Sequence, residues 1–535
     1  MYLAYTLLVL MKSDGITAVE RALPCLHESV NSSSRCVRWS FFVTGAFMRI
    51  FPSEDAFVGL AENRSYRVAP VMGEMLADTF TPIELVRLLS AQSRHVFLLE
   101  SLEDKEHWGR YSFLGFSPKL EIRVKDGVVR INGEALPGNP NPNTVLRELL
   151  SEHRAPHMPD MPPFTGGLVG YFAFDYLRYS EPTAIADTED AEDFADCDLM
   201  LFDEVIVFDH LRQKLLLVVN ARLDEPRAGY REALERIATL KEMLGSSARR
   251  TPPAGRLLGP MTPLFNRARF TEMVQAAKHA IFEGDVFQLV LSNRFSAPFE
   301  GSLFNTYRQL RAINPSPYMF YLSGTDVEVA GASPETLVRL QAGTLHTFPL
   351  AGTRARGKTP SEDRALEAEL LADEKELAEH NMLVDLGRND LGRVSRFGTV
   401  RVEKLRAIER FSHVMHIGST VRGEIRPECD ALDAINAVLP AGTLSGAPKI
   451  RACQLIGEIE GVKRGIYGGA LGYIDFSGNM DTAIAIRIAY RKGDRVFVRS
   501  GAGIVADSVP EKEYQECVNK ARAVVTALEQ AGELE

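Results

Sequence analysis

The spacing of apolar and polar residues predicts short strands and helices along most of the chain. Apolar positions recur at helical spacing in residues 82–89, whereas residues 120–124 alternate between apolar and polar, as a half-buried strand does. Because helices and strands follow one another without a regular strand–helix–strand repeat, this order favours an α+β fold with antiparallel sheets over a doubly wound parallel sheet. Further strands are expected at residues 96–99, 128–131, 166–171, 205–208, 215–219 and 495–499.

One helix is expected over residues 361–391, where leucines recur near helical spacing. It is expected to begin at Ser361, and the acidic residues that follow complement the positive end of the helix dipole. Glu376 and Glu379 stand three positions apart in it, so their side chains project from neighbouring positions on one side.

A second helix with paired glutamates is expected near the end of the chain. Residues 508–511 have the pattern of a capping box with proline in the first turn, and Glu513 and Glu516 are again three positions apart. Glutamates on helices are mostly solvated, and that interpretation fits all four of these residues. The alternative is that one glutamate from each helix helps to hold Mg²⁺, which needs few protein carboxylates. The spacing leaves both interpretations open.

Glycine, proline and small polar residues gather at residues 246–262, which is typical of a linker. We therefore expect an N-terminal domain at residues 51–245 and a larger domain at residues 263–530. Residues 1–50 are interpreted as an extension of unknown role, or as an upstream segment that a mis-assigned start includes. Their apolar run precedes its nearby lysine, which is the reverse of a secretory signal.

Composition excludes several classes of function. The net charge of −10 argues against binding to nucleic acid or to an anionic membrane surface, since both need a cationic face. The six cysteines are far apart and form no CxxC pair, so neither a disulfide framework nor a zinc site is expected. No apolar run is long enough to span a bilayer. A cytoplasmic protein fits these features.

Two glycine-rich segments require a choice between ligands. Residues 501–506 match G-x-G-x-x-A after a strand, but the helix signals come later, at Ser508, so dinucleotide binding is disfavoured. Backbone N–H groups in that loop could still hold a carboxylate. Residues 442–449 end in lysine without the G-K-[ST] of a phosphate loop, and we interpret them as a turn before a helix that begins at Pro448.

Several motifs, taken together and in order, resemble the chorismate-utilising enzymes and, within them, component I of the anthranilate synthases. The resemblance covers about residues 51–530 and implies an antiparallel β-sandwich core with helices packed outside and strands from both halves interleaved. The motifs lie at residues 349–354, 375–380, 382–390, 413–416, 442–449, 467–473 and 501–505.

The resemblance also implies roles for individual residues. Chorismate is the implied substrate, and Mg²⁺ the implied cofactor, held by Glu379 and Glu516 with Glu513 nearby. Intact catalytic positions argue against the alternative of a binding protein without activity. The implied catalytic residues are Glu335 as general acid, His416 beside the substrate ring, and Thr353. The implied substrate-binding residues are Gln288, Ala351, Gly352, Tyr467, Arg487, Gly501, Ala502, Gly503 and Lys520.

Two positions separate this chain from close relatives. Isochorismate and salicylate synthases have a water-activating lysine where Gln288 stands, and aminodeoxychorismate synthases typically have a nucleophilic lysine where Ala351 stands. A neutral glutamine and an alanine favour direct attack by ammonia. The expected products are therefore anthranilate and pyruvate, in the first committed step of tryptophan biosynthesis. Aminodeoxychorismate and isochorismate or salicylate synthesis are the alternatives.

The resemblance further implies a partner and a regulator. The chain has no recognisable glutamine-hydrolysing module, so a separate glutamine amidotransferase subunit (component II) is expected to supply ammonia within a hetero-oligomer. Feedback inhibition by tryptophan is expected at a second pocket. Arg110 stands where many relatives have a lysine near that ligand, which is a departure from the pattern. The residues implied for this pocket are Glu100, Ser101, Pro317, Tyr318 and Met319.

Overall fold

The structure is a computed structural model that describes residues 48–102, 109–185, 188–410 and 414–534. Residues 49–535 form one unit. The extension expected at residues 1–50 lies outside the described residues as far as position 47. In the part of the chain that is described, no helix is both long and apolar enough to cross a membrane.

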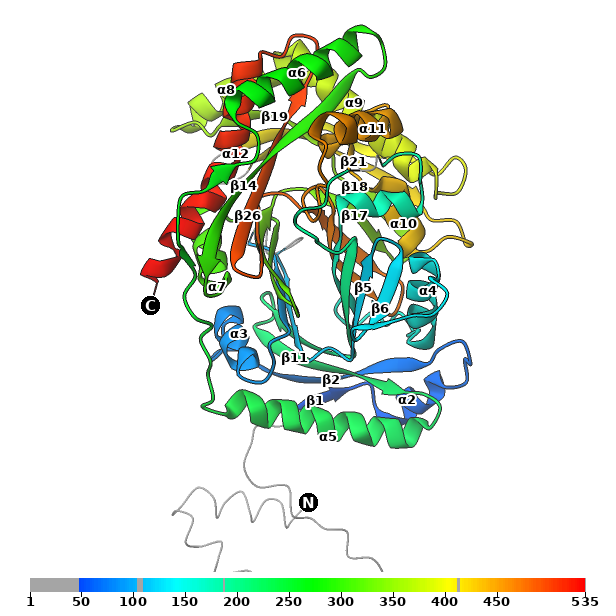
Figure 1. Ribbon diagram of the computed structural model, residues 1–535. Coiled ribbons are helices and arrows are strands. Elements are labelled where there is room, and N and C mark those ends of the chain that lie inside the picture. Colours follow the sequence, from blue (N-terminus) through cyan, green and yellow to red (C-terminus); the bar gives the residue numbers. More distant parts are fainter. Residues whose placement is uncertain (1–47, 103–108, 186–187, 411–413, 535) are drawn as a thin grey trace, which may run out of the picture. The chain divides into compact units, whose positions relative to one another are not determined.

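The described residues form two sheets in which every pair of neighbouring strands is antiparallel (Figure 1). Strands from both sides of the predicted linker share each sheet, because β3 pairs with β15 in the larger sheet and β8 pairs with β23 in the smaller one. The larger sheet runs in the order β1 (Arg49–Phe51), β2 (Val68–Leu76), β11 (Lys214–Arg222), β10 (Glu204–Asp209), β4 (Tyr111–Phe116), β3 (Val96–Glu100), β15 (Tyr318–Ser323), β16 (Val327–Ser333), β25 (Ile488–Lys492), β26 (Arg495–Ile504), β14 (Gln288–Glu300) and β12 (Arg256–Leu257), with β13 (Thr262–Pro263) and β22 (Gly446–Ala447) beside β14. The smaller sheet runs in the order β19 (Leu350–Ala355), β21 (Val414–Glu424), β18 (Thr344–Thr347), β17 (Thr336–Gln341), β24 (Met480–Ile484), β23 (Ala470–Asp475), β8 (Gly167–Phe172), β9 (Cys197–Phe202), β5 (Leu120–Lys125), β6 (Val128–Ile131) and β7 (Glu134–Ala135), with β20 (Arg401–Arg410) beside β21.

Helices pack on the outside of the two sheets. Helix α5 lies along β1, β2 and β11, whereas α6, α8, α9 and α11 gather at the opposite end (Figure 1). The helices are α2 (Glu54–Leu60), α3 (Pro82–Ser90), α4 (Pro142–Glu152), α5 (Pro226–Gly245), α6 (Arg267–Phe282), α7 (Phe304–Ile313), α8 (Pro360–Ala372), α9 (Glu374–Gly392), α10 (Ala431–Val438), α11 (Lys449–Glu460) and α12 (Pro510–Gln530). The α+β class and the antiparallel sandwich with outer helices are therefore confirmed.

The main core lies between the sheets. Along β9 the side chains alternate: Met200 and Phe202 pack against the larger sheet, and Leu199 and Leu201 pack towards the outer helices. Strand β9 is buried on both faces for this reason. A strand with both faces covered reads as a continuous apolar run, so its sequence alone does not say which layer each side chain joins.

The helix expected over residues 361–391 is instead two helices, α8 and α9. Thr359, rather than Ser361, caps α8 by accepting a hydrogen bond from the backbone N–H of Glu362. Asp373 separates the helices, since its carboxylate accepts from two backbone N–H groups in the first turn of α9. The helix break follows from this second cap, because Asp competes for backbone donors that a continuous helix would use itself.

The N-terminal cap expected for the last helix is also wrong. Helix α12 begins at Pro510 with Val509 before it, and no side chain caps it. The Ser508 hydroxyl accepts from the backbone N–H of Val505 instead. Proline in the first turn is confirmed. Ser508 closes the turn after β26, so it does not satisfy the free donors of the helix.

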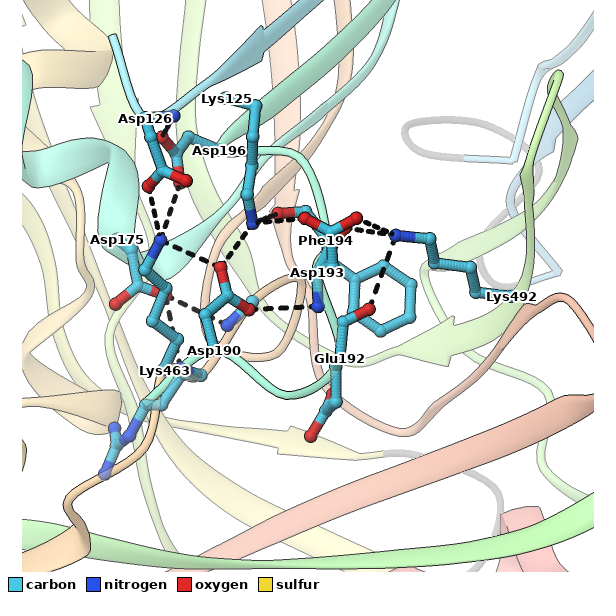
Figure 2. A network of polar contacts seen from close by, with 12 residues as sticks. Lys125, Asp126, Asp175, Asp190, Glu192, Asp193, Phe194, Asp196, Lys463 and Lys492 are labelled. Atoms are coloured by element: carbon cyan, nitrogen blue, oxygen red, sulfur yellow. Dashed lines mark hydrogen bonds and ion pairs between the residues drawn. The ribbon is translucent and has the colours of Figure 1, made fainter. Parts of the chain in front are cut away.

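The acidic residues at 187–198 predict a solvated loop, but in the described part, residues 188–198, they form ion pairs with lysines from distant parts of the chain (Figure 2). The Lys463 amine lies 2.7 Å from Asp126, 2.9 Å from Asp190 and 3.9 Å from Asp196. Lys125 pairs with Asp190 as well. These ion pairs join strand β5 of the N-terminal half to the segment that follows α11. Charge composition alone misses this role, because the partner lysines are distant in sequence.

Candidate active site

A cavity of about 490 Å³ opens where β14, β19, β21, β26 and the turn after β16 meet α9 and α12, and this volume suits a small-molecule ligand. Nearly all the residues expected to bind substrate or metal or to act in catalysis line it. They are Gln288, Glu335, Ala351, Gly352, Thr353, Glu379, His416, Tyr467, Arg487, Gly501, Gly503, Glu513, Glu516 and Lys520. Stretches more than 200 residues apart in sequence thus converge on one space.

Ala502 is the one expected substrate-binding residue that does not line the cavity. Side chains on a strand alternate, so Gly501 and Gly503 of β26 face the cavity while Ala502 packs into the core behind it. A Cβ on Gly503 would lie 2.7 Å from the amide nitrogen of Gln288. A Cβ on Gly501 would lie 2.9 Å from the Tyr467 hydroxyl. The two glycines therefore leave room for neighbouring side chains.

Glu335 lies in the turn between β16 and β17. The Ser333 hydroxyl fixes this turn by donating 2.7 Å to the Ile484 carbonyl, and the Thr443 hydroxyl donates 3.2 Å to the Glu335 carboxylate. Burial raises the pKa of Glu335 to about 7, against the opposing effects of Thr443, Arg487 and Lys520. Near neutral pH a large share of this carboxyl is therefore protonated. Thr443 was not expected here, because its glycine-rich segment predicts only a turn.

His416 is oriented by a bulge in the neighbouring strand. The register between β19 and β21 shifts between Ala351 and Thr353, and Gly352 at the bulge has a φ of +65°. The His416 Nδ1 lies 2.8 Å from the Gly352 carbonyl and 3.2 Å from the Thr353 hydroxyl. A carbonyl only accepts, so Nδ1 carries the proton and Nε2 carries the lone pair of the neutral ring. Burial lowers the pKa of His416, which favours that neutral form.

Carboxylates from α9 and α12 face one another across the cavity. Burial raises the pKa of Glu379, and the charges of Glu376 and Glu516 raise it further. Burial also raises the pKa of Glu513, and Glu516 adds to the shift. Glu379 of α9 and Glu513 and Glu516 of α12 all line the same cavity.

The glutamate carboxylates in the cavity are oxygen ligands of the type that Mg²⁺ prefers. In the described part of the chain, no group of three or more His, Cys, Asp or Glu side chains converges closely enough to form a complete metal site. Mg²⁺ is often bound through one or two carboxylates, with water and substrate oxygens as its other ligands. Lys520 lies 2.7 Å from Glu516 and donates 3.1 Å to the Gly501 carbonyl, so it partly balances the acidic side chains.

Gln288 presents a buried acceptor to the cavity. Its side chain is 5% exposed, and no group in the described residues donates a hydrogen bond to its carbonyl oxygen. An unsatisfied buried acceptor is unfavourable by about 1–3 kcal/mol, which points to a ligand that donates here. The amide nitrogen of the same side chain lies beside Gly503. Ala351, the other position that separates the relatives, lines the same cavity.

A buried charge cluster lies directly behind the cavity wall. Glu460 accepts from both Arg464 and Arg499, and none of the three side chains is more than 1% exposed. Arg464 also donates to the carbonyls of Val290 and Leu444, whose residues line the cavity. The cluster carries two positive charges and one negative charge. Sequence analysis did not identify it, since pairs of this kind are visible only once distant strands are placed.

The residues expected to bind tryptophan lie together at the junction of β3 and β15. Met319 pairs with Glu100 across the two strands, and Ser101 and Pro317 follow and precede them. Glu100 is buried and accepts from Arg311 and Tyr307. Arg110, the departure from the family pattern, pairs with Asp209 at 2.9 Å.

Tyr318 connects this region to the cavity. Its hydroxyl lies 2.9 Å from the hydroxyl of Thr336, the residue after Glu335, and donates 2.8 Å to Asp481. The expected regulatory residues and the expected general acid are thus separated by one hydrogen-bonded side chain.

Comparison with known proteins places this cavity in a family. Residues 94–526 match the model of the chorismate binding enzyme family. The chain therefore belongs to the chorismate binding enzymes.

Its relatives narrow the assignment. The chain is 45% identical over 495 residues to anthranilate synthase component 1 of Acetivibrio thermocellus, covering 90% of this chain and 99% of that protein. It is also 45% identical over 487 residues to anthranilate synthase component 1 of Aquifex aeolicus, covering 89% and 97%. The crystal structure of anthranilate synthase component I from Streptococcus pneumoniae is 39% identical, with a TM-score of 0.70 over 79% of this chain and 93% of that one. Within its family, the chain is an enzyme of the anthranilate synthase component 1 group.

Proposed function

We propose that this enzyme converts chorismate and ammonia into anthranilate and pyruvate with Mg²⁺, as the larger part of a complex with a glutamine amidotransferase subunit. The observation that carries the proposal is the composition of the cavity. It combines a carboxyl with a raised pKa, Glu335, with glutamates from two helices, and it has no lysine at positions 288 and 351.

Glu335 is suited to the departure of the ring hydroxyl. Hydroxide is a poor leaving group, so an acid must deliver a proton to the C4 oxygen as ammonia forms its bond to C2. The protonated Glu335 carboxyl supplies that proton, and the hydroxyl leaves as water. The burial that raises its pKa to about 7 keeps this proton available at neutral pH.

Mg²⁺, when bound by Glu379 and Glu516 with Glu513 nearby, would neutralise a substrate carboxylate in an otherwise acidic region. Arg487 and Lys520 add fixed positive charge along the same wall. The buried Arg464–Glu460–Arg499 cluster adds net positive charge behind it. Together these charges favour a substrate with two carboxylates.

The second step removes pyruvate and the C2 proton, which makes the ring aromatic. His416 has the properties of a base for that proton, because its ring is neutral and the lone pair is on Nε2. The Gly352 carbonyl and the Thr353 hydroxyl hold the ring in this orientation.

Gln288 and Ala351 favour ammonia as the nucleophile. A glutamine amide is not basic enough to activate water, but its buried carbonyl oxygen can accept a hydrogen bond from ammonia. Ala351 has no amine that could attack the substrate first. These two positions support anthranilate over isochorismate or 4-amino-4-deoxychorismate.

Tryptophan feedback forms the regulatory part of the proposal. The residues at the junction of β3 and β15 would bind tryptophan, and Tyr318 would transmit binding to the turn that holds Glu335. Inhibition then requires that tryptophan bind better when this turn is in an inactive arrangement.

An assay of the purified chain tests the proposal. With chorismate, Mg²⁺ and ammonium, anthranilate fluorescence should develop, and it should stop with EDTA and return with added Mg²⁺. Chromatography of the products provides the control for identity. Accumulation of isochorismate or 4-amino-4-deoxychorismate in place of anthranilate would reject the assignment.

A further inference from the structure

Two phenylalanines, at the end of α6 and in the turn that follows it, are largely exposed. The side chain of Phe282 is 86% exposed and that of Phe287 is 76% exposed. Val509, which precedes α12, is 42% exposed. Exposed aromatic side chains in close succession are unfavourable in water unless another surface covers them. We call Phe282, Phe287 and Val509 the rim patch.

The rim patch borders the cavity. Phe287 immediately precedes Gln288, and alternation along the strand sends Gln288 into the cavity while Phe287 points outwards. Val509 immediately follows Ser508, which also lines the cavity. Lys278 of α6 donates 2.7 Å to the Ser508 carbonyl, and Phe282 lies one helical turn after Lys278 on the same face.

The turn that presents these aromatic residues is fixed. The backbone N–H of Phe287 donates 2.8 Å to the Ala447 carbonyl, and the Asp285 carboxylate lies 2.7 Å from Arg451 of α11. Gly284 ends α6 with a φ of +85°. Side chains on such a pre-organised scaffold lose little conformational entropy when a partner binds.

We propose that the rim patch is the docking surface for the ammonia-supplying subunit, an inference that rests on the proposed function. Ammonia is mostly protonated in neutral water, and ammonium is not a nucleophile. A subunit that supplies ammonia must therefore seal against the rim of the cavity on the side of Gln288, where the rim patch lies. An apolar centre flanked by charged residues such as Glu283, Asp285 and Arg451 also has the composition of a protein interface.

The test uses the full chain and the glutamine amidotransferase subunit encoded by the same genome. Phe282→Asp and Phe287→Asp should each weaken binding between the subunits by about 30-fold or more, as expected for aromatic anchors of an interface. Glutamine-dependent anthranilate formation should fall in parallel. Ammonium-dependent formation should stay within about twofold of wild type, because these side chains lie outside the cavity.

Phe397→Asp is the matched control. Phe397 is 106% exposed but follows the C-terminal end of α9, which lies about 20 Å along that helix from Glu379. It should change neither activity. The inference is overturned if Phe282→Asp binds the amidotransferase subunit as tightly as wild type. It is also overturned if the substitution disrupts association between copies of this chain but leaves binding to the amidotransferase subunit intact. A wild-type chain that makes no anthranilate even from ammonium would instead reject the proposed function.

Discussion

At the scale of single residues, the surroundings of each carboxyl decide what it does. Glu335 stands apart from the other glutamates, and burial alone raises its pKa to about 7. Burial also raises the pKa of Glu379 and of Glu513, and there the charge of Glu516 adds to both shifts, which a bound cation would relieve. The same residue type therefore serves as a proton donor at one place and as a candidate metal ligand at another.

The charge state of Glu335 predicts a pH profile. Only the protonated carboxyl donates a proton, so kcat/KM for chorismate should fall as pH rises through about 7, with free ammonia held constant. Glu335→Gln should lower activity by about 100- to 10,000-fold. Thr443→Val removes a hydrogen bond that lowers the pKa, so its alkaline limb should move to higher pH. An unchanged limb in Thr443→Val would contradict this assignment.

Sequence motifs predict which residues line the cavity when the motif itself contains the reactive side chain, and they miss residues whose position depends on a neighbour in space. Glu335 and His416 both line the cavity, and short sequence motifs identify each of them. The sequence does not reveal the roles of Thr443 and of the Arg464–Glu460–Arg499 cluster, because Thr443 bonds to Glu335 and Arg499 pairs with Glu460, both distant in sequence. Ala502 lies between Gly501 and Gly503, which line the cavity, yet the alternation of β26 turns Ala502 away from it.

At the scale of elements, two adjacent strands connect the expected regulatory region to the active site. Strand β15 lies between β3, which carries Glu100, and β16, which leads to Glu335. Tyr318 at the start of β15 contacts the first residue of β17. The hairpin formed by β15 and β16 therefore joins the expected regulatory region to the turn that carries Glu335.

This connection predicts that Tyr318→Phe loosens regulation and largely spares catalysis. Loss of the Tyr318 hydroxyl should raise the tryptophan concentration needed for half-inhibition by about fivefold or more, while kcat changes little. Tyr321→Phe, on the same strand but bonded to Glu328, provides the control and should keep normal inhibition. Dose–response curves for tryptophan at fixed chorismate give the comparison. Equal sensitivity of Tyr318→Phe and wild type would break the proposed connection.

Element boundaries were less predictable than the elements themselves. The strands expected at residues 96–99 and 120–124 are present. Asp373 interrupts the expected long helix because its side chain competes for backbone N–H groups. Leucine periodicity continues across this break, so the apolar pattern conceals it.

At the scale of the whole molecule, ion pairs and shared sheets join the two halves of the sequence. Lys463 is 9% exposed and contacts Asp126, Asp190 and Asp196, all from the N-terminal half. The segment that begins with Lys463 leads directly to Arg464 and Tyr467. The linker expected at residues 246–262 therefore separates stretches of sequence that share both sheets.

Lys463→Met should accordingly destabilise the entire protein. It removes the cation that three carboxylates share, and among the described residues only Lys125 beside Asp190 and Arg178 beside Asp126 remain. We expect a loss of about 2–3 kcal/mol in the free energy of unfolding. Lys404→Met removes an exposed pair with Glu409 and should change stability by less than about 1 kcal/mol. Urea titrations followed by fluorescence and by circular dichroism measure both variants. If Lys463→Met is as stable as wild type, the ion pairs do not hold the halves together.

The central claim is that glutamates from α9 and α12 share one divalent cation beside the substrate. Crystals grown with Mn²⁺ in place of Mg²⁺ and with chorismate, but without ammonia, test it through anomalous diffraction. The account predicts one strong peak within about 2.0–2.5 Å of carboxylate oxygens from both Glu379 and Glu516. A peak bound by only one of the two helices, or no peak in the cavity at saturating Mn²⁺, would contradict it.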